Sequence, residues 1–132
     1  MLPFTIKVKK IKGKGRGKAL GIPTLNFSIP QELNLPFGVY AGRLKTNKQF
    51  YPAALHFGPR PVFSEKDISL EAYILNIFDE ELKDAELEFV KFIREIKNFA
   101  DQKQMVERIK EDVKEIKNVL RNYEGELGES LT

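Results

Sequence analysis

The apolar residues of this chain fall into short runs that are separated by glycine and proline. These runs lie at residues 4–8, 25–29, 39–41, 50–57, 70–78 and 87–93. In the first run Phe4, Ile6 and Val8 alternate with polar residues, a pattern typical of a strand that is buried on one face. About six short strands joined by glycine and proline turns predict an antiparallel barrel.

Polar and rigid segments mark the turns that we expect between these strands. Pro30 should end the second strand, because proline cannot donate a hydrogen bond to a ladder. We expect Gly42 to Lys48 to form a polar loop and Gly58 to Pro61 to form a loop or tight corner. The charged stretch from Asp79 to Asp84 predicts a further turn.

A helical pattern follows the last apolar run. Apolar side chains recur every three or four residues at Met105, Ile109, Val113, Ile116 and Leu120. This spacing predicts an amphipathic helix whose apolar stripe faces the core. Asp101 is the expected N-cap, and Gly125 is the expected stop. We therefore expect one domain over residues 1–125 and a polar tail over residues 126–132.

The stretch GKGRGKALGIPTLNF, residues 13–27, has the composition of an anion-binding loop. Its glycines are Gly13, Gly15, Gly17 and Gly21. Glycine allows the backbone to approach a ligand closely, and successive N–H groups then form a concave anion site. Lys18 lies inside the stretch and is the best candidate for a phosphate contact. A solvated basic turn is the alternative, and composition alone favours it, because such runs are common in loops.

Thr24 and Asn26 close this stretch with two oxygen-bearing side chains. They lie two residues apart, so an extended backbone directs both the same way. Hard oxygens beside a phosphate loop suit Mg²⁺. The working hypothesis is therefore a nucleotide and metal site. The spacing excludes a standard Walker loop, since Lys12 stands where its first glycine should be and Ala19 follows Lys18.

Glu71 is a carboxylate within the most apolar of the expected strands, residues 70–78. Both faces of that strand are largely apolar, so we expect it to be mostly buried. An unpaired buried charge is costly, so Glu71 needs a partner, an opening to water or a function. A strand-end carboxylate in solvent is the alternative, and the sequence alone does not separate these.

Length and composition restrict the classes of protein to be considered. The chain has 132 residues and no cysteine, which fits a single domain in a reducing cytoplasm. We see neither a signal peptide nor a membrane span. Residues 1–31 hold seven lysines and arginines and no acidic residue, a charge that attracts nucleic acid and ATP equally. His56 is the one histidine, and a structural role is the favoured interpretation.

Several linked motifs resemble the riboflavin kinase family of bacteria and eukaryotes. Its pattern V-x-G-x-x-x-G-R/K-x-L-G-x-P-T-A-N is matched by Ile11, Gly13, Gly17, Lys18, Leu20, Gly21, Pro23, Thr24 and Asn26. Further similarity lies in LPFGVYA at 35–41, FGPRPVF at 57–63, LEAYIL at 70–75 and the segment from Ile93 to Asp112. The departures are Leu25, Val62, Asn76, the shortened turn at 82–84, Ile96 and Asn98.

The resemblance implies a six-stranded Greek-key barrel with the C-terminal helix packed outside, and transfer of phosphate from ATP to riboflavin. FMN and ADP would be the products. It implies that Glu71 is the catalytic base, that the glycines and Lys18 hold the phosphates, and that Thr24 and Asn26 ligate Mg²⁺. Arg94 and Phe99 would lie near the flavin. We expect a monomer and, since no adenylyltransferase domain precedes Phe4, no formation of FAD.

A binding module without turnover is the rival hypothesis. It would be either a flavin- or nucleotide-binding relative that has lost catalysis or a small basic barrel that binds RNA. The presence of Lys18, Thr24, Asn26 and Glu71 argues against lost catalysis. The aromatic residues are not interleaved with the basic run, which argues against a surface for stacking bases.

Overall fold

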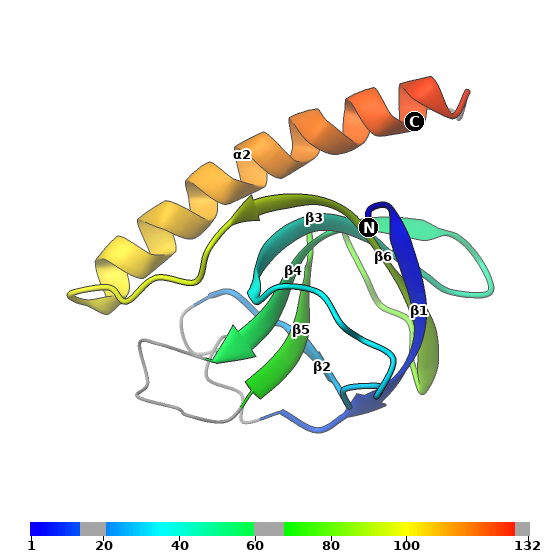
Figure 1. The fold of residues 1–132 in the computed structure, drawn as a ribbon, viewed down its shortest axis with the longest axis horizontal. Coiled ribbons are helices and arrows are strands. Elements are labelled where there is room, and N and C mark those ends of the chain that lie inside the picture. Colours follow the sequence, from blue (N-terminus) through cyan, green and yellow to red (C-terminus); the bar gives the residue numbers. More distant parts are fainter. Residues whose placement is uncertain (14–20, 60–67, 129–132) are drawn as a thin grey trace.

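The computed structural model describes residues 1–13, 21–59 and 68–128, which contain six strands and one long helix. In chain order the elements are β1 (Phe4–Ile11), β2 (Leu25–Phe27), β3 (Gly38–Lys45), β4 (Phe50–Pro59), β5 (Ile68–Ile74), β6 (Asp84–Arg94) and α2 (Gln102–Glu126). Figure 1 shows the strands wrapped into a barrel and α2 lying across its outside.

The strands close into an antiparallel barrel with the order β1-β2-β5-β4-β3-β6. The barrel closes because β6 pairs with β1 on one edge and with β3 on the other. Strands β3, β4 and β5 are consecutive neighbours, and β6 returns to lie beside β3, which is the Greek-key arrangement. The predicted fold class is therefore confirmed.

One face of each strand fills the barrel interior. The side chains there that are almost completely buried include Tyr40, Phe27, Phe89, Leu44, Leu55, Leu70 and Leu87. The Tyr40 ring packs edge-on against Phe89, with 5.2 Å between centroids, and its hydroxyl donates to the Pro36 carbonyl at 2.6 Å. Burial raises the pKa of Tyr40. Burying a large apolar side chain contributes about 1.5–3 kcal/mol, so these residues dominate the stability of the barrel.

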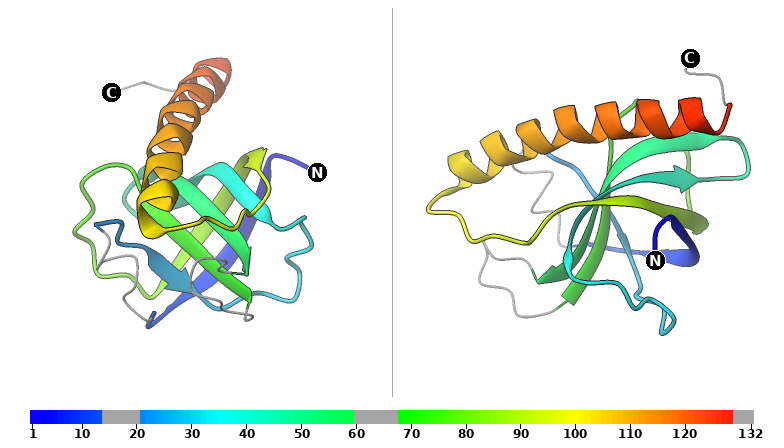
Figure 2. Two further views of the ribbon diagram at one scale, coloured as in Figure 1. Left: turned by 90° about the vertical axis from the view of Figure 1, so that its left-hand side faces the viewer. Right: turned by 45° about the horizontal axis from the view of Figure 1, so that its top comes forward.

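A second, smaller core lies between the barrel and the helix. Helix α2 packs mainly against β3, β4 and β6, and both views in Figure 2 show it lying along that side. Ile116 and Leu120 of α2 meet Val39 and Ala41 on the outer face of β3. The outer face of the barrel thus includes an apolar area that lies under the helix.

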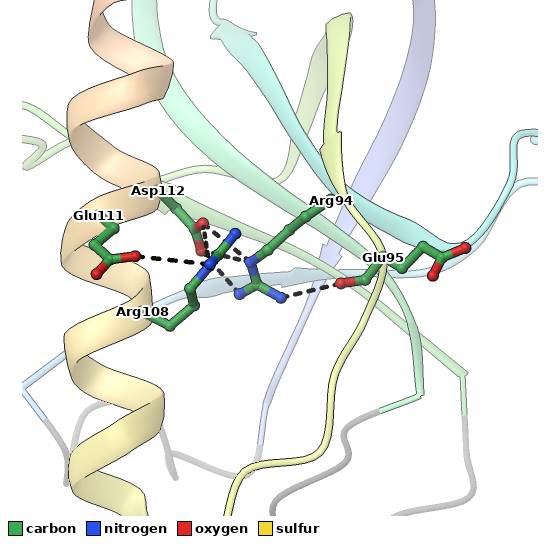
Figure 3. A network of polar contacts seen from close by, with 5 residues as sticks. All are labelled: Arg94, Glu95, Arg108, Glu111 and Asp112. Atoms are coloured by element: carbon green, nitrogen blue, oxygen red, sulfur yellow. Dashed lines mark hydrogen bonds and ion pairs between the residues drawn. The ribbon is translucent and has the colours of Figure 1, made fainter.

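Two buried arginines tie α2 to the barrel. At the end of β6, Arg94 donates from Nε and Nη2 to the Asp112 carboxylate at 2.8–3.0 Å, and both side chains are buried (Figure 3). Arg108 approaches the same carboxylate at 3.4 Å.

On β3, the buried Arg43 pairs with Glu88 at 2.6 Å and with Glu124 of α2 at 3.2 Å. Each arginine has a carboxylate partner, which offsets the cost of burying its charge.

Three expectations about the strands prove wrong. Strand β3 continues through Gly42 to Lys45, where we expected a loop, because the polar Arg43 is buried with its acidic partners. Gly58 and Pro59 end β4 instead of forming a loop, whereas residues 60 and 61 lie outside the described residues. Strand β5 ends at Ile74, so Ile77 is 93% exposed and not buried in a strand.

The strand ends and the helix end also need correction. Strand β2 stops at Phe27, so Ile29, which was expected in this strand, lies outside it and is 39% exposed. Helix α2 begins as predicted, because the Asp101 side chain accepts from the Gln104 N–H at 2.9 Å. It does not stop at Gly125. It runs to Glu126, and the left-handed backbone that favours glycine is found at Gly128, where φ is 74°.

In the part of the chain that the structure describes, no helix has both the length and the apolar composition that a membrane span requires.

We predict that Asp112→Ala destabilises the fold by about 3–5 kcal/mol, because it leaves the buried Arg94 without its carboxylate. Urea unfolding followed by circular dichroism measures the change in free energy of unfolding. Glu111→Ala is the matched control, since Glu111 is 71% exposed and pairs with Arg108 only at 3.7 Å, so its effect should be below about 0.5 kcal/mol. Equal losses in the two variants would contradict this account.

We predict that Tyr51 makes stability depend on pH in the alkaline range. Its hydroxyl donates a hydrogen bond to Glu80. This hydrogen bond is the largest cause, and burial the second largest, of a rise in the pKa of Tyr51 from 10.0 to about 12. The stabilisation is complete below pH 10.0 and is lost as pH rises toward about 12, because the unfolded chain releases the proton first. Urea unfolding from pH 9 to pH 12 should show a smaller loss of stability in Tyr51→Phe than in the parent.

Candidate active site

Three adjacent strands bring three polar residues into one row. In the strand register Asn26 of β2 lies opposite Glu71 of β5, and Glu71 lies opposite His56 of β4. The residues that precede and follow these three polar residues along their strands belong to the interior core. They are Leu25, Phe27, Leu70, Ala72, Leu55 and Phe57. Since side chains alternate along a strand, the row faces the outside of the barrel.

The Glu71 carboxylate is held by two hydroxyl groups. Thr24 Oγ1 donates to Glu71 Oε1 at 2.8 Å, and Ser69 Oγ donates to Oε2 at 2.8 Å. Glu71 is only 8% exposed, so the alternative of a strand-end carboxylate in solvent is wrong. Hydrogen bonds to an ionised acceptor are short and strong. The two donors therefore fix both oxygens of a buried carboxylate at the outer surface of the barrel.

Thr24 and Asn26 both lie beside this carboxylate. Thr24 reaches it by the hydrogen bond just described, and Asn26 is its neighbour across the ladder. A threonine hydroxyl that donates its hydrogen retains two lone pairs, so it can still accept a hydrogen bond or contact a cation. The expectation that an extended backbone directs the two side chains the same way agrees with this arrangement.

Gly13 lies under the Asn26 side chain. A Cβ at position 13 would be 2.0 Å from Asn26 Nδ2 and 2.6 Å from its Cγ, so only glycine fits without displacing the amide. Gly21, at the other end of the glycine-rich stretch, has a φ of 77°, which strains any other residue. Gly15, Gly17 and Lys18 lie outside the described residues.

The oxygens present are of the kind that Mg²⁺ prefers. A threonine hydroxyl, an asparagine amide and a carboxylate converge at this point of the barrel. No group of three or more His, Cys, Asp and Glu side chains suited to a metal occurs within residues 1–13, 21–59 and 68–128. Mg²⁺ is commonly bound by one or two protein oxygens together with substrate phosphates, so the donors here fit that ion.

A basic groove adjoins Gly13. It has a volume of about 680 Å³ and is lined mainly by Lys9, Lys10, Lys12 and Lys83, with Asp84 as the acidic member. Lys9 and Asp84 lie opposite each other on β1 and β6. The excess of lysine attracts anions to the side of the barrel where the glycine-rich stretch begins.

Arg94 and Phe99 lie close together, with the guanidinium carbon 5.8 Å from the centre of the ring. The structure also gives Arg94 a partner that sequence reasoning did not identify, the Asp112 carboxylate. The sequence of the helix contained an indication of this ion pair. Asp112, Ile116 and Leu120 are the buried residues of α2, so Asp112 occupies the apolar stripe where Val113 was expected. An acidic residue in such a stripe indicates a buried partner.

Ser69 and Gly58 are the site residues that sequence reasoning missed. Ser69 lies two residues before Glu71 and therefore on the same face, but the expected strand began one residue later, at Leu70. Gly58 has a φ of 140°, and a Cβ there would be 2.3 Å from Ile96 Cδ1. Its carbonyl accepts from His56 Nε2 at 3.0 Å, which gives His56 a structural contact beside Glu71.

Comparison with known proteins supports one family. The family model for riboflavin kinase, named flavokinase, matches residues 1–120. Mouse riboflavin kinase is 31% identical over 127 residues, which cover 90% of this chain and 82% of the mouse protein. The bifunctional riboflavin kinase/FMN adenylyltransferase of Bacillus subtilis is 32% identical over 118 residues, covering 86% of this chain but 37% of that protein.

The chain spans only 31% of a further relative, the bifunctional riboflavin kinase/FMN phosphatase of Arabidopsis thaliana, to which it is 34% identical. Among solved structures, riboflavin kinase from Trypanosoma brucei has a TM-score of 0.61 at 20% identity, covering 92% of this chain and 82% of that one. A structure described as a macrolide-efflux protein from Streptococcus pneumoniae has a TM-score of 0.75 at 23% identity, covering 88% and 39%. At these identities the two structures show a shared fold.

None of these similarities favours a binding module without turnover. The family model covers all of the barrel and most of α2, including Gly13, Thr24, Asn26 and Glu71. The chain belongs to the riboflavin kinase family.

Proposed function

We propose that this protein transfers the γ-phosphate of ATP to the 5′-hydroxyl of riboflavin, which gives FMN and ADP. One observation carries the proposal: Glu71 is a buried carboxylate held by the Thr24 hydroxyl and flanked by Asn26. Phosphoryl transfer depends on positioning and on neutralisation of charge, and this arrangement provides an oriented base beside oxygens that suit a cation.

Glu71 acts as the general base. Its carboxylate takes the proton of the ribityl 5′-hydroxyl while the oxygen of that hydroxyl attacks the γ-phosphorus. A carboxylate has about four lone-pair sites, so it can accept hydrogen bonds from hydroxyl groups and still take up a proton. The hydrogen bonds to its two oxygens hold the group in one orientation, which favours a single direction of approach for the substrate hydroxyl.

Thr24 and Asn26 ligate Mg²⁺, and the glycine-rich stretch binds the phosphates. The ion, when bound, neutralises charge on the phosphate oxygens. Gly13 leaves room for the Asn26 side chain, and Gly21 adopts the positive φ that favours glycine. We assign Gly15, Gly17 and Lys18 to the same phosphate-binding loop. The basic groove beside Gly13 supports the approach of a polyanion such as ATP.

Arg94 and Phe99 contribute to the flavin site. Arg94 is held by Asp112, so its guanidinium is pre-oriented, and its central carbon lies 5.8 Å from the centre of the Phe99 ring. Because of that ion pair, we propose that Arg94 shapes the site by packing and does not supply a free charge to the flavin.

We further propose that residues 1–125 form the kinase domain, that residues 126–132 are a tail, and that the protein acts as a monomer in the cytoplasm. Helix α2 ends at Glu126, one residue beyond this boundary, and the absence of cysteine fits a reducing compartment.

The activity is tested by incubating the pure protein with riboflavin and Mg-ATP, and separately with riboflavin and Mg-CTP, and measuring FMN by chromatography. FMN should accumulate with Mg-ATP, and FMN with Mg-CTP alone would contradict ATP as the donor. Absence of FMN with both nucleotides, in a protein that is folded by circular dichroism, would overturn the proposed function.

We predict that Glu71→Gln lowers kcat by about 10²–10⁴-fold, because it removes the proton acceptor and keeps the shape of the side chain. The KM for nucleotide should change little, since the loss belongs to the transition state. Steady-state kinetics and a melting curve separate the possibilities. A raised nucleotide KM with unchanged kcat would indicate a binding role, and a lowered Tm alone would indicate a structural one.

We predict that Thr24→Ala and Asn26→Ala each weaken binding of Mg-ADP while the fold remains intact. Each removes one oxygen of the pair proposed to ligate the ion. Isothermal titration calorimetry measures the affinity, and Asn47→Ala in the turn between β3 and β4 is the matched control. If both site variants bind Mg-ADP as tightly as the parent and the control, the metal assignment is wrong.

A further inference from the structure

Glu71 has a second anchor that lies on its own strand. Ser69 precedes it by two residues on β5, so the two side chains share the outer face. The Ser69 hydroxyl is 2.8 Å from Glu71 Oε2, the oxygen that Thr24 does not contact. The two hydroxyls thus hold the two oxygens of one carboxylate.

The Ser69 hydroxyl has one hydrogen, and two acceptors among the described residues lie within its reach. The Gly58 carbonyl, opposite Ser69 across the ladder, is 3.4 Å away, and Glu71 Oε2 is 2.8 Å away. The Gly58 carbonyl already accepts from His56 Nε2 at 3.0 Å. The shorter bond to a charged acceptor is the stronger one, so the hydrogen belongs to Glu71.

The strand pairing fixes where this hydroxyl lies. Gly58 and Ser69 are partners in the β4–β5 ladder, and His56 is the partner of Glu71 two residues further along. Ser69 is itself half-buried, which limits the alternative positions of its side chain. A hydroxyl on a strand that is paired with β4 is a more rigid support than one on a free loop.

We infer that Ser69 is a positioning residue for Glu71, which orients the carboxylate by a hydrogen bond to Oε2 without touching the substrate. The inference rests on the proposed function, because it assigns Ser69 to the support of the proposed base. Loss of the Ser69 hydrogen bond would remove a restraint on Oε2, and the direction in which the carboxylate accepts a proton would vary more.

The test compares kcat and KM in Ser69→Ala, Ser69→Thr and the parent. Ser69→Ala should lower kcat by about 10- to 100-fold, the loss typical when a group that orients a functional side chain is removed. The KM values for riboflavin and Mg-ATP should stay within about twofold, since binding is not the affected step. Ser69→Thr keeps a hydroxyl at the same place and should restore kcat.

Two controls separate positioning from a structural role. Ser28→Ala makes the same substitution at an exposed serine whose hydroxyl contacts the Lys9 carbonyl at 3.4 Å, and it should leave kcat unchanged. In a Glu71→Gln background, Ser69→Ala should have less than about a twofold further effect, because residues that act as a unit are not additive.

The outcomes distinguish this inference from the proposed function. If the parent makes FMN and Glu71→Gln does not, but Ser69→Ala retains the parent kcat, the inference fails and the function stands. The inference also fails if Ser69→Ala lowers only Tm, or lowers kcat equally in both backgrounds. A parent that makes no FMN overturns both.

Discussion

The pairing of β2 on both of its edges is the constraint on which the barrel and the candidate site depend. Strand β2 has three residues, yet it joins β1 to β5 and so completes the ring of strands. Its register puts Phe27 in the interior and Asn26 beside Glu71. A slip of one residue would turn Phe27 outward and Asn26 inward, because side chains alternate along a strand. The hydrophobic core therefore also sets the geometry of the polar row.

Charge pairs determine how the helix is attached. The apolar contact between α2 and the barrel is small, and it is flanked by the buried pairs of Arg94 with Asp112 and of Arg43 with Glu88 and Glu124. Ion pairs of this kind contribute little net stability relative to apolar residues, but removing one partner is costly. They therefore specify one position of α2, and with it the path of the segment that carries Phe99.

The parts of the structure that local patterns control were predictable. Alternation of apolar residues predicted the strands, and the Asp101 cap and the apolar spacing predicted the helix. The wrong expectations concern residues whose local sequence indicates one structure while contacts with distant residues stabilise another. Arg43 looked like a loop residue because its acidic partners lie on β6 and α2. Strict alternation along the strand would put Ile93 on the same face as Leu87 and Phe89, but register shifts along the β3–β6 ladder place it against the helix.

The sequence by itself determined that the chain forms short strands and one helix, that residues 13–27 are rich in glycine and basic side chains, and that a carboxylate occupies an apolar strand. Its motifs also pointed to the family. Only the tertiary structure decided that Glu71 is buried between the Thr24 and Ser69 hydroxyls, that Asn26 lies over Gly13, and that Asp112 is the partner of Arg94. The physical reason is that periodicity and capping act between near neighbours in the chain, whereas strand register and the pairing of buried charges depend on which distant segments pack together.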